Sequence, residues 1–159
     1  MAKISPPPLQ MPSAFVQDKE ISSFFDQLLR VIYQMWVELF DIRTKARTTT
    51  TNATPTSLQF VTIDTNRSIY VEASVVARRT GGSAGTTGDS AFYKISGGFK
   101  NIAGTVTQVG STVTDSGEDQ AGWNCAFVIS GASVVITGTG AANNNITWES
   151  SVSYHEVGA

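Results

Sequence analysis

Charged side chains are scarce in this chain, and so are the residue types that most often perform acid–base or thiol chemistry. Asp, Glu, Lys and Arg make up 15% of the 159 residues, well below the roughly 25% of an average soluble domain. The sequence has one histidine, His155, and one cysteine, Cys125, so an intrachain disulfide is excluded. We expect Cys125 to be a buried small hydrophobic residue. The net charge of −2 argues against a general nucleic-acid-binding surface, so no nucleic-acid partner is expected.

The short patterns that resemble functional motifs are incomplete. Residues 81–88 have the glycines of a phosphate-binding loop, but they lack its Gly-Lys-Ser/Thr ending and no helix is predicted after them, which favours a flexible hairpin loop. Asp115, Glu118 and Asp119 match no calcium-loop spacing, which favours an ordinary acidic turn. His155 has no serine or cysteine partner that the sequence identifies. These gaps predict a protein that is not an enzyme and holds no metal or cofactor.

Signals for export or membrane insertion are also missing. The first apolar stretch begins only after residues 6–8, all proline, and has no basic segment leading to a cleavage site. That stretch is interrupted by Asp26, Arg30 and Glu38, so it is too polar to span a bilayer. We expect no membrane span, and a protein that is made in a cytoplasm and stays soluble or joins an assembly there.

Proline is concentrated at the start of the chain. Residues 1–17 hold three prolines in succession and a further one at Pro12. Successive prolines fix φ and favour an extended polyproline II arm, which does not fold alone and is either disordered or laid on a partner. Residues 18–43 follow as a predicted N-terminal helix, in which Asp18 suits the N-cap and Glu20 the first turn.

The helix, predicted to end near residue 41, is apolar over much of its circumference. Its apolar residues recur every three or four positions, and two series of them lie seven apart, as in a short coiled coil or a groove-binding helix. Such a helix, left uncovered, would expose a patch large enough to cause aggregation. We predict that it forms a docking and oligomer interface, most simply in a homotrimer; the alternative is that it packs on its own β-rich body. The predicted interface consists of Ile21, Phe24, Phe25, Leu28, Ile32, Met35, Trp36 and Leu39.

From residue 44 to 159 the apolar residues alternate with polar ones, which is the period of a β-strand. Seven or eight short strands separated by turn residues predict a mainly β domain, an antiparallel sandwich of jelly-roll or immunoglobulin-like type. In the longest strand the inward face carries Ile69, Val71, Ala73, Val75 and Ala77. A bulge is expected at residues 97–98, both glycine. The predicted strands cover residues 44–51, 57–63, 68–79, 90–102, 105–114, 122–130, 133–138 and 146–157.

Two further groups of side chains are assigned ordinary structural roles rather than binding roles. Trp123 and Trp148 fall in predicted strands and are expected in the core, with an exposed sugar-binding platform as the alternative. Arg43, Lys45 and Arg47 would share one face of a strand. A solvated face or a salt bridge to another subunit explains that basic run better than phosphate binding does.

Several stretches resemble the β-rich domains of tailed-bacteriophage virion proteins. The N-terminal run at residues 24–36 is similar to the helical starts of small phage structural proteins. The shared residues are packing and turn residues and extend over nearly the whole chain. The stretches in the β-rich part are residues 75–82, 88–94, 98–100, 134–138 and 145–148, together with Val152.

This resemblance implies a non-enzymatic structural protein of the virion, assembled in the host cytoplasm. We expect a tail-associated fibre or adaptor component that is attached by its arm and helix while the sandwich projects outward. Its expected partners are further copies of itself, as a homotrimer, and other virion proteins. A capsid decoration or head-fibre protein is the alternative within this class. The alternative from another class is a carbohydrate-binding module that recognises a host surface glycan.

Overall fold

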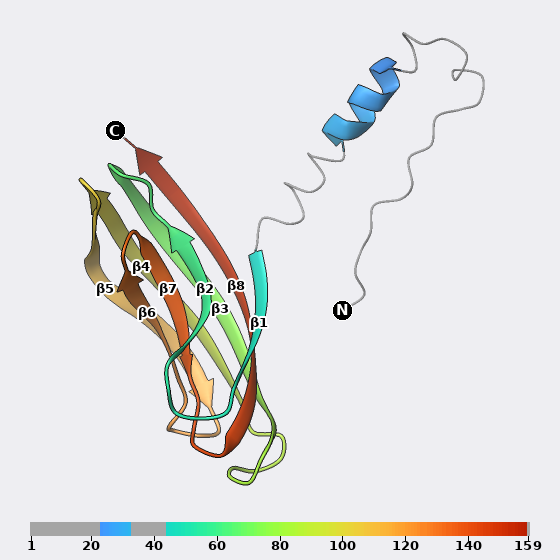
Figure 1. Ribbon diagram of the computed structural model, residues 1–159, viewed down its shortest axis with the longest axis vertical. Coiled ribbons are helices and arrows are strands. Elements are labelled where there is room, and N and C mark those ends of the chain that lie inside the picture. Colours follow the sequence, from blue (N-terminus) through green and yellow to red (C-terminus); the bar gives the residue numbers. More distant parts are fainter. Residues whose placement is uncertain (1–22, 33–43, 159) are drawn as a thin grey trace, which may run out of the picture. The chain divides into compact units, whose positions relative to one another are not determined.

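The computed structural model describes residues 23–32 and 44–158 (Figure 1). The chain divides into two compact units, Met1–Ile42 and Arg43–Ala159, which are described separately. In the first unit, residues 23–32 form an α-helix, inside the segment predicted to be helical. The predicted 1–17 arm and the remainder of the predicted helix lie outside the described residues.

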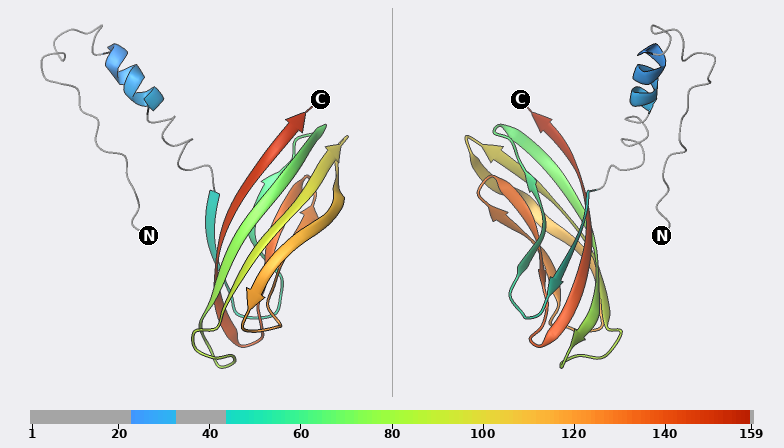
Figure 2. Two further views of the ribbon diagram at one scale, coloured as in Figure 1. Left: turned by 180° about the vertical axis from the view of Figure 1, so that it is seen from behind. Right: turned by 45° about the vertical axis from the view of Figure 1, so that its right-hand side comes forward.

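The second unit is built from antiparallel strands in two sheets, as the alternating sequence pattern predicts (Figures 1 and 2). One sheet has five strands in the order β1-β8-β3-β4-β5, and the other has three in the order β2-β7-β6. The predicted mainly β sandwich is therefore confirmed. The strands are β1 (Thr44–Thr50), β2 (Thr56–Thr62), β3 (Arg67–Gly82), β4 (Ser90–Ile102), β5 (Thr105–Glu118), β6 (Asn124–Ser130), β7 (Ser133–Thr139) and β8 (Asn144–Gly158).

Alternation of side chains explains which face of each sheet is buried. In β3 the odd-numbered positions from Ile69 to Ala77 are buried and the residues between them are mostly exposed, as predicted. β4 continues this inner face with Tyr93, Ile95 and Phe99. The inner face of the three-stranded sheet covers these residues, so the core lies between the sheets.

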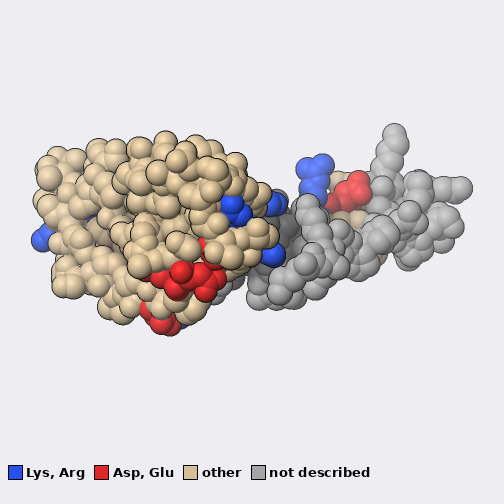
Figure 3. All heavy atoms as spheres, turned by 90° about the horizontal axis from the view of Figure 1, so that it is seen from below, with Lys and Arg blue, Asp and Glu red and all other residues tan. Residues whose placement is uncertain are grey.

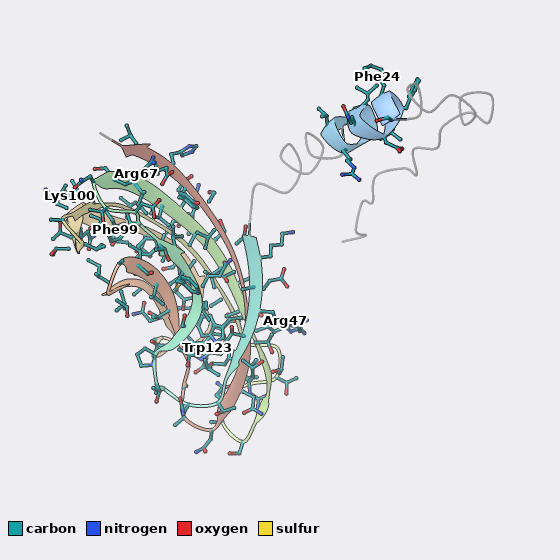
Figure 4. The ribbon with its side chains drawn as sticks, turned by 45° about the horizontal axis from the view of Figure 1, so that its top comes forward. Phe24, Arg47, Arg67, Phe99, Lys100 and Trp123 are labelled. Carbon is teal, nitrogen blue, oxygen red and sulfur yellow. The ribbon has the colours of Figure 1, made fainter. Side chains whose placement is uncertain are left out.

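Aromatic rings fill the core at both ends of the sandwich (Figure 4). The ring centroids of Trp123 and Trp148 lie 6.2 Å apart, and that of Tyr93 lies 6.3 Å from Trp148. Toward the other end, Phe99 meets Phe127 edge to face at 5.4 Å. Both tryptophans are buried, so their expected place in the core is confirmed and neither of them forms an exposed sugar-binding platform.

Two buried polar contacts join segments that are distant in the sequence. The indole Nε1 of Trp148 donates a hydrogen bond to Thr50 Oγ1 at 2.8 Å, which connects β8 to the end of β1. Asn101 Nδ2 on β4 donates to the carbonyl of Ile63, just after β2, at 2.7 Å and so ties one sheet to the other. Such contacts fix register because a buried donor without a partner would be costly.

The strand β5 departs most from the sequence prediction. A bulge lies at Gly97 as predicted, but the additional residues are on β5, where residues 110–112 lie opposite Gly97 and Gly110 has a φ of 74°. Val109 and Val113, on either side of this bulge, are exposed. β5 also extends to Glu118, so the turn predicted from Asp115 onwards starts only after the strand ends.

Candidate functional site

The apolar helix is the first candidate for a functional surface. Phe24 is 62% exposed, and Leu28, Val31 and Ile32 are exposed as well, while Phe25 is partly buried and its ring packs edge to face on Phe24 with centroids 6.0 Å apart. These residues include half of the predicted interface. Ile21, Met35, Trp36 and Leu39 lie outside the described residues, so the interface as a whole stays a prediction.

The loop predicted at residues 81–88 starts later, because β3 runs to Gly82; residues 83–89 connect β3 to β4 and are held by their own neighbours. Arg79 Nε donates to the carbonyl of Ala84 at 2.7 Å, and its terminal nitrogen donates to the carbonyl of Gly82 at 2.6 Å. The buried Asp89 carboxylate accepts hydrogen bonds from the Thr86 amide at 2.7 Å and from Gln120 Nε2 at 2.8 Å. The Arg79 guanidinium, which could otherwise bind a phosphate, thus donates to carbonyls of the chain itself. The loop is followed by strand β4 and not by the helix of a phosphate-binding loop. The loop is a hairpin connection, as predicted, but these bonds fix its conformation.

The acidic residues singled out in the sequence do not converge. Glu118 Oε2 accepts a hydrogen bond from the Tyr93 hydroxyl at 2.5 Å, whereas Asp119 accepts one from the Ser90 amide at 2.9 Å. Burial, together with the hydrogen bond and negative charge of Glu118, raises the pKa of the Tyr93 phenol far above its ordinary value. Asp115 lies on another part of β5, in register with Lys94. Among residues 23–32 and 44–158, no three His, Cys, Asp or Glu side chains are grouped as metal ligands would be.

The outer face of the five-stranded sheet carries two aromatic side chains that the sequence analysis did not single out. Phe92 is 50% exposed, and its ring lies against Gly117, where an added Cβ would come within 2.5 Å of a ring carbon. Tyr70 is 46% exposed on β3 and is in register with His155 on β8. The sequence contained a signal for their outward position, because both aromatics occupy the strand positions that alternate with the core residues.

Charges of both signs surround these aromatics on the same face. The strand register places Lys94 between Ser74 and Asp115, and it places Arg47 directly opposite Glu149. Lys45 and Arg47 are exposed on this face of β1, as expected for a solvated face, while Arg43 lies outside the described residues. Figure 3, a view from below, shows the charged groups of the β-rich unit as small areas among uncharged residues. Within the described part of this face, the charged residues are Lys45, Arg47, Arg78, Lys94, Lys100, Glu72, Asp115 and Glu149.

Cys125 and His155, the single members of their residue types, lie in different environments. Cys125 is buried on β6, as predicted, and burial raises the pKa of its thiol to about 12. A thiol in this state is a poor nucleophile. His155 is exposed near the end of β8. None of the helices in the described residues is long and apolar enough to cross a membrane.

Comparison with known proteins gives distant structural similarities. No protein-family model matches the sequence, and no curated protein matches it significantly. Among solved structures, the tailspike of Acinetobacter baumannii phage AM24 is 5% identical with a TM-score of 0.40, covering 74% of this chain and 27% of the tailspike. The tailspike of Acinetobacter phage vB_ApiP_P1 is 13% identical with a TM-score of 0.42, covering 74% of this chain and 22% of its own.

A third tailspike, gp49 from Acinetobacter baumannii bacteriophage Fri1, is described as a capsular polysaccharide depolymerase. It is 12% identical with a TM-score of 0.32, covering 69% of this chain and 17% of gp49. This chain thus spans about a quarter or less of the length of the solved tailspikes that it matches. Similarity at this level does not by itself assign a fold family or a function.

The Fri1 protein contradicts the prediction that this protein is not an enzyme. That prediction depended on the lack of a catalytic pattern in the sequence, yet a structural neighbour of the chain is described as a depolymerase, which is an enzyme. Catalytic side chains come together in the fold from distant positions, so their absence as a sequence motif does not exclude catalysis. We do not retain the prediction.

Proposed function

We propose that the protein is a tail-associated component of a bacteriophage virion, of the fibre or adaptor type. The N-terminal segment with its helix attaches the protein to the particle, and the β-sandwich extends from the attachment point. One observation carries the proposal: Phe24 and Val31 are exposed on a helix that belongs to a different compact unit from the sandwich. An apolar helix surface of this kind is stabilised when another chain covers it.

The helix is also the proposed contact between copies of the protein. Phe25 and Ile32 in the described helix are seven residues apart, and Leu39 continues the series in the sequence. Apolar residues at this spacing form the seam of a coiled coil. We propose a homotrimer held by this seam, with other virion proteins as the remaining partners.

Labelling of purified particles tests the location. Antibodies against the β-sandwich, coupled to gold and viewed by electron microscopy, should decorate the tail. Decoration of the head would instead support the alternative of a capsid decoration or head-fibre protein. If the chain is absent from purified particles by both labelling and mass spectrometry, the proposal fails in both forms.

The outer face of the five-stranded sheet favours a second candidate function, recognition of a host surface glycan. The exposed ring of Phe92 offers apolar contact, and Lys94 and Asp115, in the neighbouring cross-strand row, offer hydrogen bonds. Binding of purified protein to host polysaccharide, measured by calorimetry, should fall strongly for Phe92→Ala. The matched control is Phe60→Ala, which removes a still more exposed aromatic from the other sheet and should leave binding unchanged.

A further inference from the structure

The edges of the two sheets differ in how well they are protected against pairing with another strand. An edge strand presents unpaired backbone donors and acceptors, and native proteins guard it with charges, prolines or bulges. The edge β1 carries Lys45 and Arg47, and the edge β5 carries the bulge at residues 110–112 together with Asp115. The edge β2 follows Pro55 and has a register shift between Ser57 and Gln59.

The fourth edge, β6, has none of these guards within the described sandwich. Its seven residues, Asn124–Ser130, include no charge, proline or glycine. Their pairing with β7 runs without a register shift from Asn124 opposite Thr139 to Ser130 opposite Ser133. Val128, on the outer face, is 46% exposed, and Ile129 is exposed as well. A regular, apolar and uncharged edge of this kind is suited to accept another strand.

The hairpin geometry shows which backbone groups are free. β6 and β7 are joined by a two-residue turn, and Gly131 in that turn has a φ of 58°. A two-residue turn places the residues that flank it, here Ser130 and Ser133, in a hydrogen-bonded pair. Hydrogen bonding to the partner then alternates along the strand. The backbone groups of Cys125, Phe127 and Ile129 therefore point away from β7 toward the free edge.

We propose that β6 pairs with β6 of a second copy of this chain, antiparallel and centred on Phe127. This register pairs all seven residues and sets outward-pointing backbone groups opposite each other: Phe127 opposite Phe127, and Cys125 opposite Ile129. On the outer face it sets Ala126 opposite Val128, a small side chain against a larger one. No charged residues oppose each other, so a two-fold contact carries none of the like-charge repulsion that a charged strand would.

The contact concerns the β-sandwich and uses neither the proposed virion role nor the helix; because a two-fold contact pairs copies two by two, it would join copies that belong to different trimers. It continues the three-stranded sheet into one of six strands across the two copies. The row Phe60–Val135–Val128 on the outer face would then be extended by Ala126 of the second copy. A two-fold contact of this kind uses the same surface on both copies, so its geometry is symmetric.

Disulfide cross-linking of the full-length chain tests the register. Ala126→Cys and Val128→Cys are made separately, mixed in equal amounts and oxidised mildly, and covalent dimer is measured by non-reducing electrophoresis. The mixture should give several times more dimer than either variant alone, because the proposed register places residue 126 opposite residue 128 at a distance that a disulfide can bridge. The wild-type chain is a control for Cys125, whose buried thiol should not react.

A charge substitution tests the contact through the same cross-link. An Ala126→Cys chain that also carries Val128→Lys should cross-link several-fold less to the Val128→Cys chain, whereas an Ala126→Cys chain that carries Phe60→Lys, on the opposite edge strand of the same sheet, should not. Efficient cross-linking of either cysteine variant alone would overturn the proposed register. Equal yields in all mixtures, or no dimer in any of them, would overturn the pairing itself. Oligomers formed through the helix would not favour one cysteine combination over another. The cross-linking pattern therefore tests the β6 pairing separately from the proposed helix seam.

Discussion

At the scale of single residues, the sandwich depends on a few buried polar atoms whose partners come from distant strands. Trp148 is fully buried, and the only polar atom of its side chain, Nε1, donates to Thr50, which is also buried. The neighbouring Thr49 points to the exposed face, where its hydroxyl lies 3.4 Å from that of Thr147. We therefore expect the side chain of Thr50 to contribute more to the free energy of unfolding than that of the adjacent Thr49.

Replacing Thr50 tests this difference. Thr50→Val keeps the shape but removes the acceptor, which leaves the Trp148 indole N–H buried without a partner. We expect the free energy of unfolding to fall by about 1–3 kcal/mol. The matched control is Thr49→Val, which should change it by less than about 0.5 kcal/mol because the site is exposed. Urea denaturation followed by tryptophan fluorescence measures both; equal effects would contradict the assigned role of the buried bond.

Cys125 makes stability dependent on pH in the alkaline range. Burial raises the pKa of its thiol from 9.0 to about 12. Between these values the unfolded chain loses the proton and the folded chain keeps it. The stability that the protonated thiol contributes is fully present below pH 9. Above pH 9 the free energy of unfolding falls by about 1.4 kcal/mol per pH unit until the folded thiol also loses its proton. The difference in unfolding free energy between the wild-type chain and Cys125→Ala, measured from pH 8 to 11, should show this slope; parallel curves would refute it.

At the scale of elements, the strands follow from the alternating sequence pattern, while the bulges and strand ends depend on pairing. The inward face of β3 could be read directly, because each apolar residue there alternates with an outward one. Strand β5 was predicted over residues 105–114, but its continuation to Glu118 was not, because residues 115–118 fit a turn as well as a strand. Its length is set by hydrogen bonding to β4, as at Glu118 opposite Ala91, which a local pattern does not contain.

The candidate surfaces were predictable to different degrees. The helix could be predicted because its apolar residues recur at a helical period. It was identified as a contact surface because these residues cover more of the helix than a solvent-exposed helix would carry. The outer aromatic Phe92 was missed because the sequence alone shows the alternation but not which face the second sheet covers. The unguarded edge of β6 was missed for a related reason, since edge position follows from the order of strands in the sheet.

The loop between β3 and β4, residues 83–89, should be sensitive to substitution at one of its glycines and more tolerant at another. Gly85 and Gly88 both have positive φ, 75° and 97°. A Cβ on Gly85 would lie 2.6 Å from the side-chain nitrogen of the buried Asn144, whereas one on Gly88 would meet nothing within 4 Å. Gly88→Ala should cost about 1–2 kcal/mol from backbone strain alone, and Gly85→Ala should cost more. Thermal unfolding monitored by circular dichroism compares them; a smaller loss for Gly85→Ala would show that the loop is not packed on Asn144.

At the scale of the whole molecule, attachment and folding are assigned to different parts of the chain. The sandwich has its own core, and all of the core residues that the structure describes belong to the second unit. The helix contributes exposed apolar surface in the first unit. This division is consistent with a protein whose body keeps its structure whether or not the N-terminal segment has found its partner.

Removing residues 1–42 tests that division. We expect the truncated chain to keep the β-type circular dichroism and the melting temperature of the full-length sandwich, because the described core residues of the sandwich all lie after residue 42. It should no longer oligomerise through the helix or enter particles, as measured by light scattering and by mass spectrometry of purified virions. Incorporation at normal occupancy would place the docking surface on the sandwich. A large drop in melting temperature would mean that the helix packs on its own body.

The pairing of the first strand with the last has a consequence for the order in which the protein folds. The side-chain bond between Thr50 and Trp148 spans 98 residues, and β8 lies between β1 and β3 in the sheet. A polypeptide leaving the ribosome can close the hairpins β3–β4 and β6–β7 early, but β1 has no hydrogen-bonded neighbour in its sheet until β8 has been synthesised. Contacts at such separation slow folding, because a long loop must close before they form. Completion of the five-stranded sheet therefore waits for β8 and comes after the apolar segment that precedes β1 has been synthesised.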